Sequence, residues 1–320
     1  MFRSESRSST WGSCSDISTE PQRLEIMNTV HNTLLNPYAS QMVHQHLAMI
    51  HTRGRRSRVL DVGAGTGSWA CDVADKNPFC DVIAVDNDWS KFAGRASLHG
   101  NVDFATLGGY RSVPGAHRQT SALRSHGQPA ALVCLTIQDT RHGALTPDLI
   151  HVKTLLLEMP DYPTLLQRLA ILLRRGGLLV VIESEPMFIP RCGGESSQAL
   201  SIWNACVRDA YCARGVDVTL PRSLSACLSA SGVFIHPAYT QEVGIPTAGY
   251  IRSASSALAK AGRLHYSVIE ANLRYLLPTV LAHGYSRAEI MRLMADVLNE
   301  LTHPSSTHHQ RLYAVYVRKA

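Results

Sequence analysis

Two acidic residues and three closely spaced glycines have the types and spacing of a nucleotide-type cofactor site: Asp61, Gly63, Gly65, Gly67 and Asp86. Glycine permits positive φ and lets main-chain N–H groups approach a ligand closely, and a helix that follows the loop points its positive end at the same place. A carboxylate at the end of the next strand can accept both hydroxyls of a ribose. The pattern therefore predicts an adenosine cofactor, with Asp86 on its ribose.

The spacing of the glycines and the charge of Asp61 indicate which adenosine cofactor binds. The dinucleotide fingerprint G-x-G-x-x-G needs a third glycine where this chain has Ser68. Asp61 would attract the ammonium group of S-adenosylmethionine, whereas it would repel the pyrophosphate of NAD. We therefore favour S-adenosylmethionine over NAD, and a ligand site over a turn that only joins a strand to a helix.

Strands and helices alternate along the chain and place these residues at one edge of a sheet. An apolar run at 59–62 predicts the strand that carries Asp61, a helix begins near Ser68, and a second strand at 82–85 ends at Asp86. Further strands are predicted at 102–104, 149–157, 178–182, from 233 and at 312–317, with an unplaced one at 130–137. Helices are predicted after Asp161, at 196–213 and at 222–231, with a loop at 244–248. This alternation is typical of the α/β class with a doubly wound, Rossmann-like sheet.

Sequence signals also place helices at both ends of the chain. Residues 1–20 are rich in Ser, Thr and charge, which predicts a disordered leader. Apolar residues at mostly three to four residue spacing predict two amphipathic helices within 22–50, which either cover the cofactor or pack on the sheet. Ser286 and Glu289 form a capping box, which predicts a helix from about Arg287.

Composition excludes several classes of function. The net charge of +6 is mild, and the densest basic cluster, within 53–58, resembles a solvated loop, so we expect no nucleic-acid partner. The eight cysteines include no C-x-x-C pair, which indicates reduced thiols and no metal site. No apolar run is long enough to cross a membrane, so we expect a protein of the cytoplasm or the nucleus.

Six blocks of the sequence resemble the class I methyltransferases and, among these, the LaeA-like fungal methyltransferases of secondary metabolism. The blocks are QRLEIMN at 22–28, VLDVGAGTGSWACDVADKNP at 59–78, VDND at 85–88, DLIHVKTLL at 148–156, DYPTLLQRLAILLRRGGLLVVIES at 161–184 and YAVYVRKA at 313–320. The resemblance implies one methyltransferase domain over 21–320, a seven-stranded sheet whose last strand is antiparallel, and S-adenosylmethionine as methyl donor.

The same resemblance implies roles for single residues. Asp61 and the three glycines would hold the methionine part of S-adenosylmethionine, Asp86 would hold the ribose, and Arg23 would close over the cofactor. One departure concerns adenine, because the family's acidic residue after the third strand is replaced by residues 107–109, LGG.

Candidates for acid–base chemistry lie near the ends of the fourth and fifth strands. A general base is optional with a reactive sulfonium donor. His151 is the first candidate and Glu183 the second, while Lys153 could stabilise an oxyanion or bind an acidic substrate. Each has a structural alternative: His151 as a hydrogen-bonded sheet residue, and Glu183 as an indirect contact of the cofactor.

The segments 186–231 and 246–301 are insertions beyond the minimal sheet and are predicted to form a helical lid over the acceptor. Five aromatic residues in these segments would line an apolar pocket or pack within the lid: Trp203, Tyr211, Tyr250, Tyr266 and Tyr275.

The function predicted from the sequence is methyl transfer to a small-molecule acceptor in fungal secondary metabolite biosynthesis. The alternative is a LaeA-type nuclear regulator that acts through protein partners, and an NAD-dependent oxidoreductase is the third reading.

Overall fold

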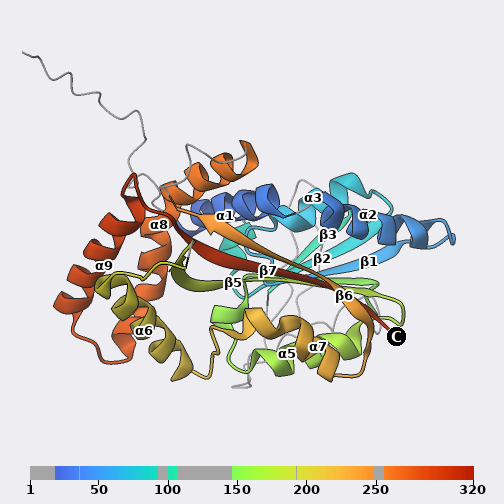
Figure 1. Ribbon diagram of the computed structural model, residues 1–320. Helices are drawn as coiled ribbons and strands as arrows, with labels where there is room; N and C mark the ends of the chain where they lie inside the picture. The colour runs from blue at the N-terminus through green and yellow to red at the C-terminus, as the bar shows by residue number, and fades with distance from the viewer. Residues whose placement is uncertain (1–18, 36, 93–99, 107–145, 192, 248–255) are drawn as a thin grey trace, which may run out of the picture.

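A seven-stranded sheet runs through the centre of the molecule in the order β3-β2-β1-β4-β5-β7-β6 (Figure 1). The structure, a computed structural model, describes residues 19–35, 37–92, 100–106, 146–191, 193–247 and 256–320. The strands are β1 (Ser57–Val62), β2 (Cys80–Asp86), β3 (Val102–Thr106), β4 (Leu149–Lys153), β5 (Leu178–Pro190), β6 (Phe234–Pro246) and β7 (His308–Lys319). β1 to β5 pair in parallel, and β7 is antiparallel to β5 and to β6. This confirms the predicted doubly wound sheet with an antiparallel last strand.

Helices cover both faces of this sheet and gather at one end (Figure 1). α1, α2 and α3 lie over one face, α5 and α7 lie over the other, and α8 passes beside α1 toward α6 and α9. The helices are α1 (Glu20–Leu34), α2 (Pro37–His51), α3 (Ser68–Lys76), α5 (Tyr162–Leu172), α6 (Gln198–Cys212), α7 (Leu224–Ala230), α8 (Ser256–Ala282) and α9 (Arg287–Thr302). The described residues also form short 3-10 turns, namely η1 (Trp89–Phe92), η2 (Leu156–Glu158) and η3 (Leu220–Ser223).

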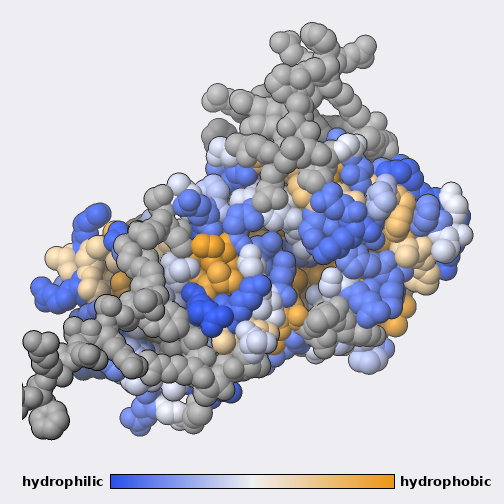
Figure 2. Space-filling view, turned by 90° about the horizontal axis from the view of Figure 1, so that it is seen from above, coloured by the Kyte–Doolittle hydropathy of each residue, from blue (hydrophilic) through white to orange (hydrophobic). Residues whose placement is uncertain are grey.

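The alternation of side chains along each strand divides the core between the two faces. In β1, Val59 packs with α2 and α3, whereas Leu60 and Val62 pack with α5. Asp61 shares its side of β1 with Val59, because successive side chains point to opposite faces. Seen from above, the helical layer over this face carries separate hydrophobic patches between hydrophilic residues (Figure 2). Among the described residues, none of the helices has the length and hydrophobicity to cross a membrane.

Most of the elements predicted from the sequence occur in the structure. The two helices predicted within 22–50 are α1 and α2, the helix after the glycines begins at Ser68, and β2 ends at Asp86. α9 begins at Arg287 as predicted, but its N-cap residue Ser286 makes no side-chain cap hydrogen bond. The helix instead has a buried apolar face, which consists of Ile290, Met294, Val297 and Leu301.

Pairing with β7 lengthens both of its neighbours beyond the prediction, whereas the strand predicted at 149–157 ends at Lys153 and is followed by η2. β5 continues to Pro190, so Glu183 lies inside the strand and not at its end, and the predicted lid segment 186–231 begins as strand. The loop predicted at 244–248 is wrong for Gly244 to Pro246, which pair with β7 as the end of β6. Ladder hydrogen bonds to a neighbouring strand override the local turn preference of glycine and proline.

The predictions for residues 1–18, 107–109 and 130–137 fall outside the described residues.

Candidate functional site

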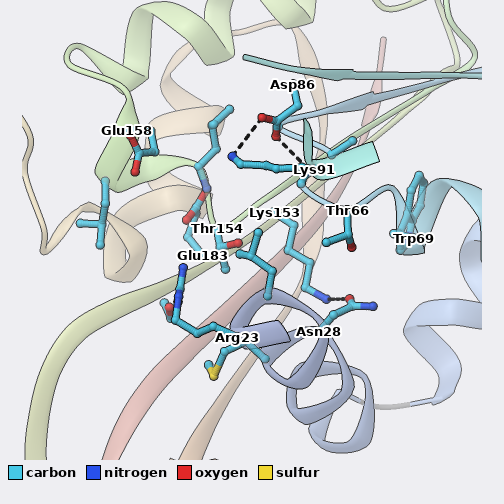
Figure 3. A pocket seen from close by; sticks show the side chains of 18 of the residues that line it. Arg23, Asn28, Thr66, Trp69, Asp86, Lys91, Lys153, Thr154, Glu158 and Glu183 are labelled. Carbon is cyan, nitrogen blue, oxygen red and sulfur yellow. Dashed lines mark hydrogen bonds and ion pairs between the residues drawn. The ribbon is translucent and has the colours of Figure 1, made fainter. Parts of the chain in front are cut away.

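A cavity of about 440 Å³ lies where the carboxyl ends of four parallel strands face α1 and α8 (Figure 3). Its walls include residues of β1, β2, β4, β5 and β7 and of the loop between β1 and α3. Ligands of open α/β sheets bind at this edge of the sheet. Of the five residues predicted to hold a cofactor, all but Gly67 line the cavity. His151, Lys153 and Glu183 line it as well.

The glycine loop has the backbone shape that the sequence predicts. Gly63, Gly65 and Gly67 all have positive φ, and Gly67 is the N-cap of α3. A Cβ atom at Gly67 would lie 2.6 Å from a ring carbon of Phe104, so both its φ of 76° and the packing of β3 require glycine. The loop therefore lies close against the sheet and leaves room for a ligand above it.

Asp86 lies at the end of β2 and receives three hydrogen bonds from the protein. Gly65 N donates to its Oδ2 at 2.8 Å, and Lys91 Nζ and Asp88 N donate to its Oδ1 at 3.0 and 3.1 Å. Figure 3 shows the ammonium group of Lys91 directed at this carboxylate. A carboxylate offers about four acceptor positions, so Oδ2 can accept a further hydroxyl. No sequence pattern predicted the role of Lys91.

Asp61 and His151 form a buried pair on the same side of the sheet. They are register partners on β1 and β4, and His151 Nδ1 lies 2.8 Å from Asp61 Oδ1. Trp69 stacks on the imidazole ring with 3.7 Å between centroids and 7° between planes. Burial lowers the pKa of His151, although Asp61 acts to raise it. Asp61 Oδ2 has no partner among the described residues.

Glu183 lies on the opposite side of the sheet from His151, because it alternates with Ile182, which pairs with Lys153. Its Oε1 accepts hydrogen bonds from Tyr162 Oη at 2.6 Å and from the N–H groups of Leu155 and Leu156 at 2.9 and 3.2 Å. Burial raises the pKa of Glu183 to about 7. The two candidate bases are therefore separated by the sheet, and Glu183 is engaged by the loop after β4 and by α5.

α1 is joined to the glycine loop and to α8 by side-chain contacts. Glu25 accepts hydrogen bonds from the hydroxyls of Thr66 and Ser68. Arg23 donates to Asn272 Oδ1 at 3.0 Å, and its guanidinium lies 4.3 Å from the ring centroid of Tyr275. These contacts place α1 across the cavity, and the sequence did not predict the contribution of Glu25.

Lys153 lies at the end of β4, and its ammonium points toward α1 (Figure 3). Its Nζ donates to Asn28 Oδ1 at 2.6 Å and to Asn32 Oδ1 at 3.3 Å. Within the described part of the chain no carboxylate forms an ion pair with it, although the charge of Asp61 acts on it. Burial lowers the pKa of Lys153 to about 7.

Of the four predicted lid aromatics that the structure describes, only Tyr275 lines the cavity. Trp203 and Tyr211 are buried core residues of α6, so for these two the alternative of lid packing is confirmed. Tyr266 is not among the lining residues, and Tyr250 lies outside the described residues. Spacing along a helix could not separate the cavity-facing aromatic from the core-facing ones.

Comparison with known proteins identifies the family. A family model described as "Methyltransferase domain" matches residues 37–233. The chain is 30% identical over 158 residues to the secondary metabolism regulator laeA of Monascus pilosus. That match covers 49% of this chain and 35% of the relative, so it spans only about a third of that protein.

Solved structures of methyltransferases are similar at low identity. Phosphoethanolamine N-methyltransferase 2 of Haemonchus contortus, in complex with phosphomonomethylethanolamine and S-adenosylhomocysteine, is 14% identical with a TM-score of 0.43 over 87% of this chain and 53% of that one. Geranyl diphosphate C-methyltransferase of Streptomyces coelicolor A3(2) is 11% identical with a TM-score of 0.41 over 96% and 87%. Likeness at this level says nothing about substrate. The family model, which matches more than half of the chain, shows that the chain belongs to the methyltransferase domain family.

Proposed function

We propose that this chain is an S-adenosylmethionine-dependent methyltransferase that acts on a small-molecule acceptor. The observation that carries the proposal is the cavity in which Asp61 and Asp86 flank the glycine loop, in a chain of the methyltransferase domain family. Its volume of about 440 Å³ is in the range of small-molecule sites.

The residues present fit this cofactor. Asp61 Oδ2 is a buried acceptor without a partner among the described residues, and an ammonium group would satisfy it. Asp86 Oδ2 can accept a ribose hydroxyl beside the bond from Gly65. Glu25 lies at the start of α3, which is the place that the pyrophosphate of a dinucleotide would need. Three carboxylates around one loop support a cationic ligand over NAD.

The bound cofactor would supply a methyl group activated by a sulfonium centre. The protein's task is then to align the acceptor with that methyl group and to exclude water. α1 performs the second part in this proposal, because Glu25 and Arg23 fasten it across the cavity. Neither part needs a general base, in line with the engagement of Glu183 by three donors and of His151 by Asp61.

The remaining wall of the cavity offers space for the acceptor between α1 and α8. Met27, Leu276 and Tyr275 contribute apolar surface, and Asn272 contributes an amide. Lys153 places an amino group without a carboxylate partner among the described residues beside this wall, which supports an acceptor that carries a negatively charged or polarised oxygen.

A second candidate function is supported by the similarity to the Monascus pilosus protein, whose name describes a regulator of secondary metabolism. In that case the chain would bind S-adenosylmethionine and act through protein partners. The same similarity supports a place in fungal secondary metabolism for either candidate.

The first test is calorimetric titration of the purified protein with S-adenosylmethionine, S-adenosylhomocysteine and NAD. We expect the first two to bind and NAD not to bind. Asp86→Ala should lower the affinity for S-adenosylmethionine and for S-adenosylhomocysteine about tenfold or more, because hydrogen bonds to a charged group contribute about 1.5–3 kcal/mol each. Asp88→Ala is the matched control, since Asp88 is exposed and bonds Ser90. Binding of NAD alone would refute the proposal.

Formation of S-adenosylhomocysteine with a panel of phenols, enols and carboxylic acids then separates the two candidates. An acceptor that turns over supports the enzyme. Tight cofactor binding without turnover of any acceptor in the panel favours the regulator.

A further inference from the structure

The pair formed by Asp61 and His151 has a geometry that a general base does not need. The two residues are opposite each other on neighbouring parallel strands, and their side chains are 2% and 1% exposed. His151 uses Nδ1 toward Asp61 Oδ1 at 2.8 Å. Its other nitrogen, Nε2, is buried without a partner among the described residues.

Trp69 fixes the plane of the imidazole. The indole is nearly parallel to the imidazole, with the centroids 3.7 Å apart, and it belongs to the first turn of α3, directly after the glycine loop. A ring held between a strand and this indole cannot rotate freely. The hydrogen bond therefore fixes Asp61 Oδ1, and with it the direction of Oδ2.

The protonation state of the pair decides what Asp61 can attract. Since burial lowers the pKa of His151, the ring is neutral near pH 7 and donates through Nδ1–H. A neutral donor orients the carboxylate without cancelling its charge, whereas an imidazolium would cancel it. The negative charge stays available at Oδ2, which has no partner among the described residues.

We propose that His151, held in place by Trp69, is a positioning residue that directs Asp61 Oδ2 at the ammonium group of the cofactor's methionine part. The inference rests on the proposed binding of S-adenosylmethionine and assigns to His151 a role in cofactor recognition instead of proton transfer. Trp69 then contributes to the same positioning indirectly, because it holds the ring of His151.

The test compares two ligands that differ in the methionine part. S-adenosylhomocysteine contains the amino-acid group, and 5′-methylthioadenosine lacks it. In calorimetric titrations, His151→Phe keeps an aromatic ring against Trp69 but removes the donor. We expect this substitution to lower the affinity for S-adenosylhomocysteine about tenfold or more and to change the affinity for 5′-methylthioadenosine by less than about threefold.

His151→Asn provides the conservative variant, because its Nδ2–H can replace the imidazole Nδ1–H. It should regain at least part of the lost affinity. Trp69→Phe should reduce the same discrimination between the two ligands by a smaller factor. His283→Phe, at an exposed position outside the cavity, is the control for the substitution itself.

A double-mutant cycle with Asp61→Asn completes the experiment. If His151 acts through Asp61, adding His151→Phe to Asp61→Asn should cause little further loss of S-adenosylhomocysteine binding. Wild-type affinity for S-adenosylhomocysteine in His151→Phe would overturn the inference, and so would an equal loss for both ligands. If the wild-type protein binds neither ligand, the proposed function itself fails.

Discussion

Glu183 is a buried carboxyl group whose three hydrogen-bond donors all belong to the protein. Burial raises its pKa from 4.5 to about 7, so the folded protein holds a proton that the unfolded chain releases between these values. The free energy of unfolding should therefore fall as the pH rises from 4.5 to about 7, because the unfolded state binds fewer protons there.

Replacing this residue by glutamine tests that expectation. Glu183→Gln keeps the acceptor oxygen but cannot ionise, so its stability relative to the wild type should rise by about 3 kcal/mol across this pH interval. Urea unfolding at several pH values measures the difference. Glu289→Gln is the control on the exposed side of α9, and its free energy of unfolding should change with pH as that of the wild type does. A constant difference between wild type and Glu183→Gln would show that Glu183 titrates normally.

Single residues also show where sequence reasoning ended. The place of Asp61 and Asp86 beside the glycine loop was predicted correctly from a stretch of fewer than thirty residues. Their partners His151 and Lys91 were not predicted as partners. His151 lies 90 positions after Asp61, and only the pairing of β1 with β4 makes them neighbours.

At the scale of elements, α1 is fastened to the glycine loop by one side chain. Glu25 accepts hydrogen bonds from Thr66 and Ser68, and it lies near the positive end of α3. Glu25→Ala should therefore increase the exchange of α1 amide hydrogens about tenfold, which corresponds to about 1.4 kcal/mol of local opening. Glu25→Gln is the matched control, because it retains an acceptor oxygen.

Hydrogen exchange followed by mass spectrometry measures this change in α1 and in α9 as an internal reference. Unchanged protection of α1 in Glu25→Ala would mean that its apolar contacts alone hold it. Those contacts are substantial, since Met27 and Val30 are buried against the sheet side of the molecule.

The same scale explains which elements were predictable. β1, α3 and β2 follow from local signals: an apolar run, glycines at the turn and a second apolar run. The outer half of β5 and the last three residues of β6 were not predicted as strand, because they pair with β7. Long-range ladders of this kind leave no periodic signal within the strand itself.

At the scale of the whole molecule, Asp148 joins three connections at the edge of the sheet opposite the cavity. Its carboxylate pairs with Arg55 at 2.6 Å and with Arg174 at 3.0 Å, and it accepts from Arg58 N at 2.9 Å. The basic cluster at 53–58 is exposed at Arg53 and Arg56, in line with the predicted solvated loop, whereas Arg55 and the N–H of Arg58 bind Asp148. Burial alone would raise the pKa of Asp148, yet the hydrogen bonds from Arg55 and Arg58 hold it below its ordinary value.

Asp148→Asn should lower the free energy of unfolding by about 2 kcal/mol near pH 7, because charge-assisted hydrogen bonds to the buried carboxylate are lost while the two arginines, 40% and 41% exposed, stay solvated. The pKa is lowered by folding, so this contribution is present above the ordinary carboxyl pKa and is lost as the pH falls through the folded value. Urea unfolding should show the two proteins converging below about pH 4.

Affinity for S-adenosylhomocysteine in Asp148→Asn should stay within about twofold of the wild type, since the substitution lies at the amino ends of the strands. A loss of affinity without a loss of stability would contradict the view that Asp148, at the amino ends of the strands, does not affect the cavity at their carboxyl ends.

The sequence by itself determined the α/β class, the glycine loop and the two carboxylates, because each depends on residues within one or two neighbouring elements. Tertiary structure alone decided what those groups contact. Strand order sets Asp61 beside His151 and places Glu183 on the other face, and chain folding brings Arg23 to Asn272, 249 positions away. Periodicity reports which side of an element is buried, whereas the partner across the gap depends on how the elements pack.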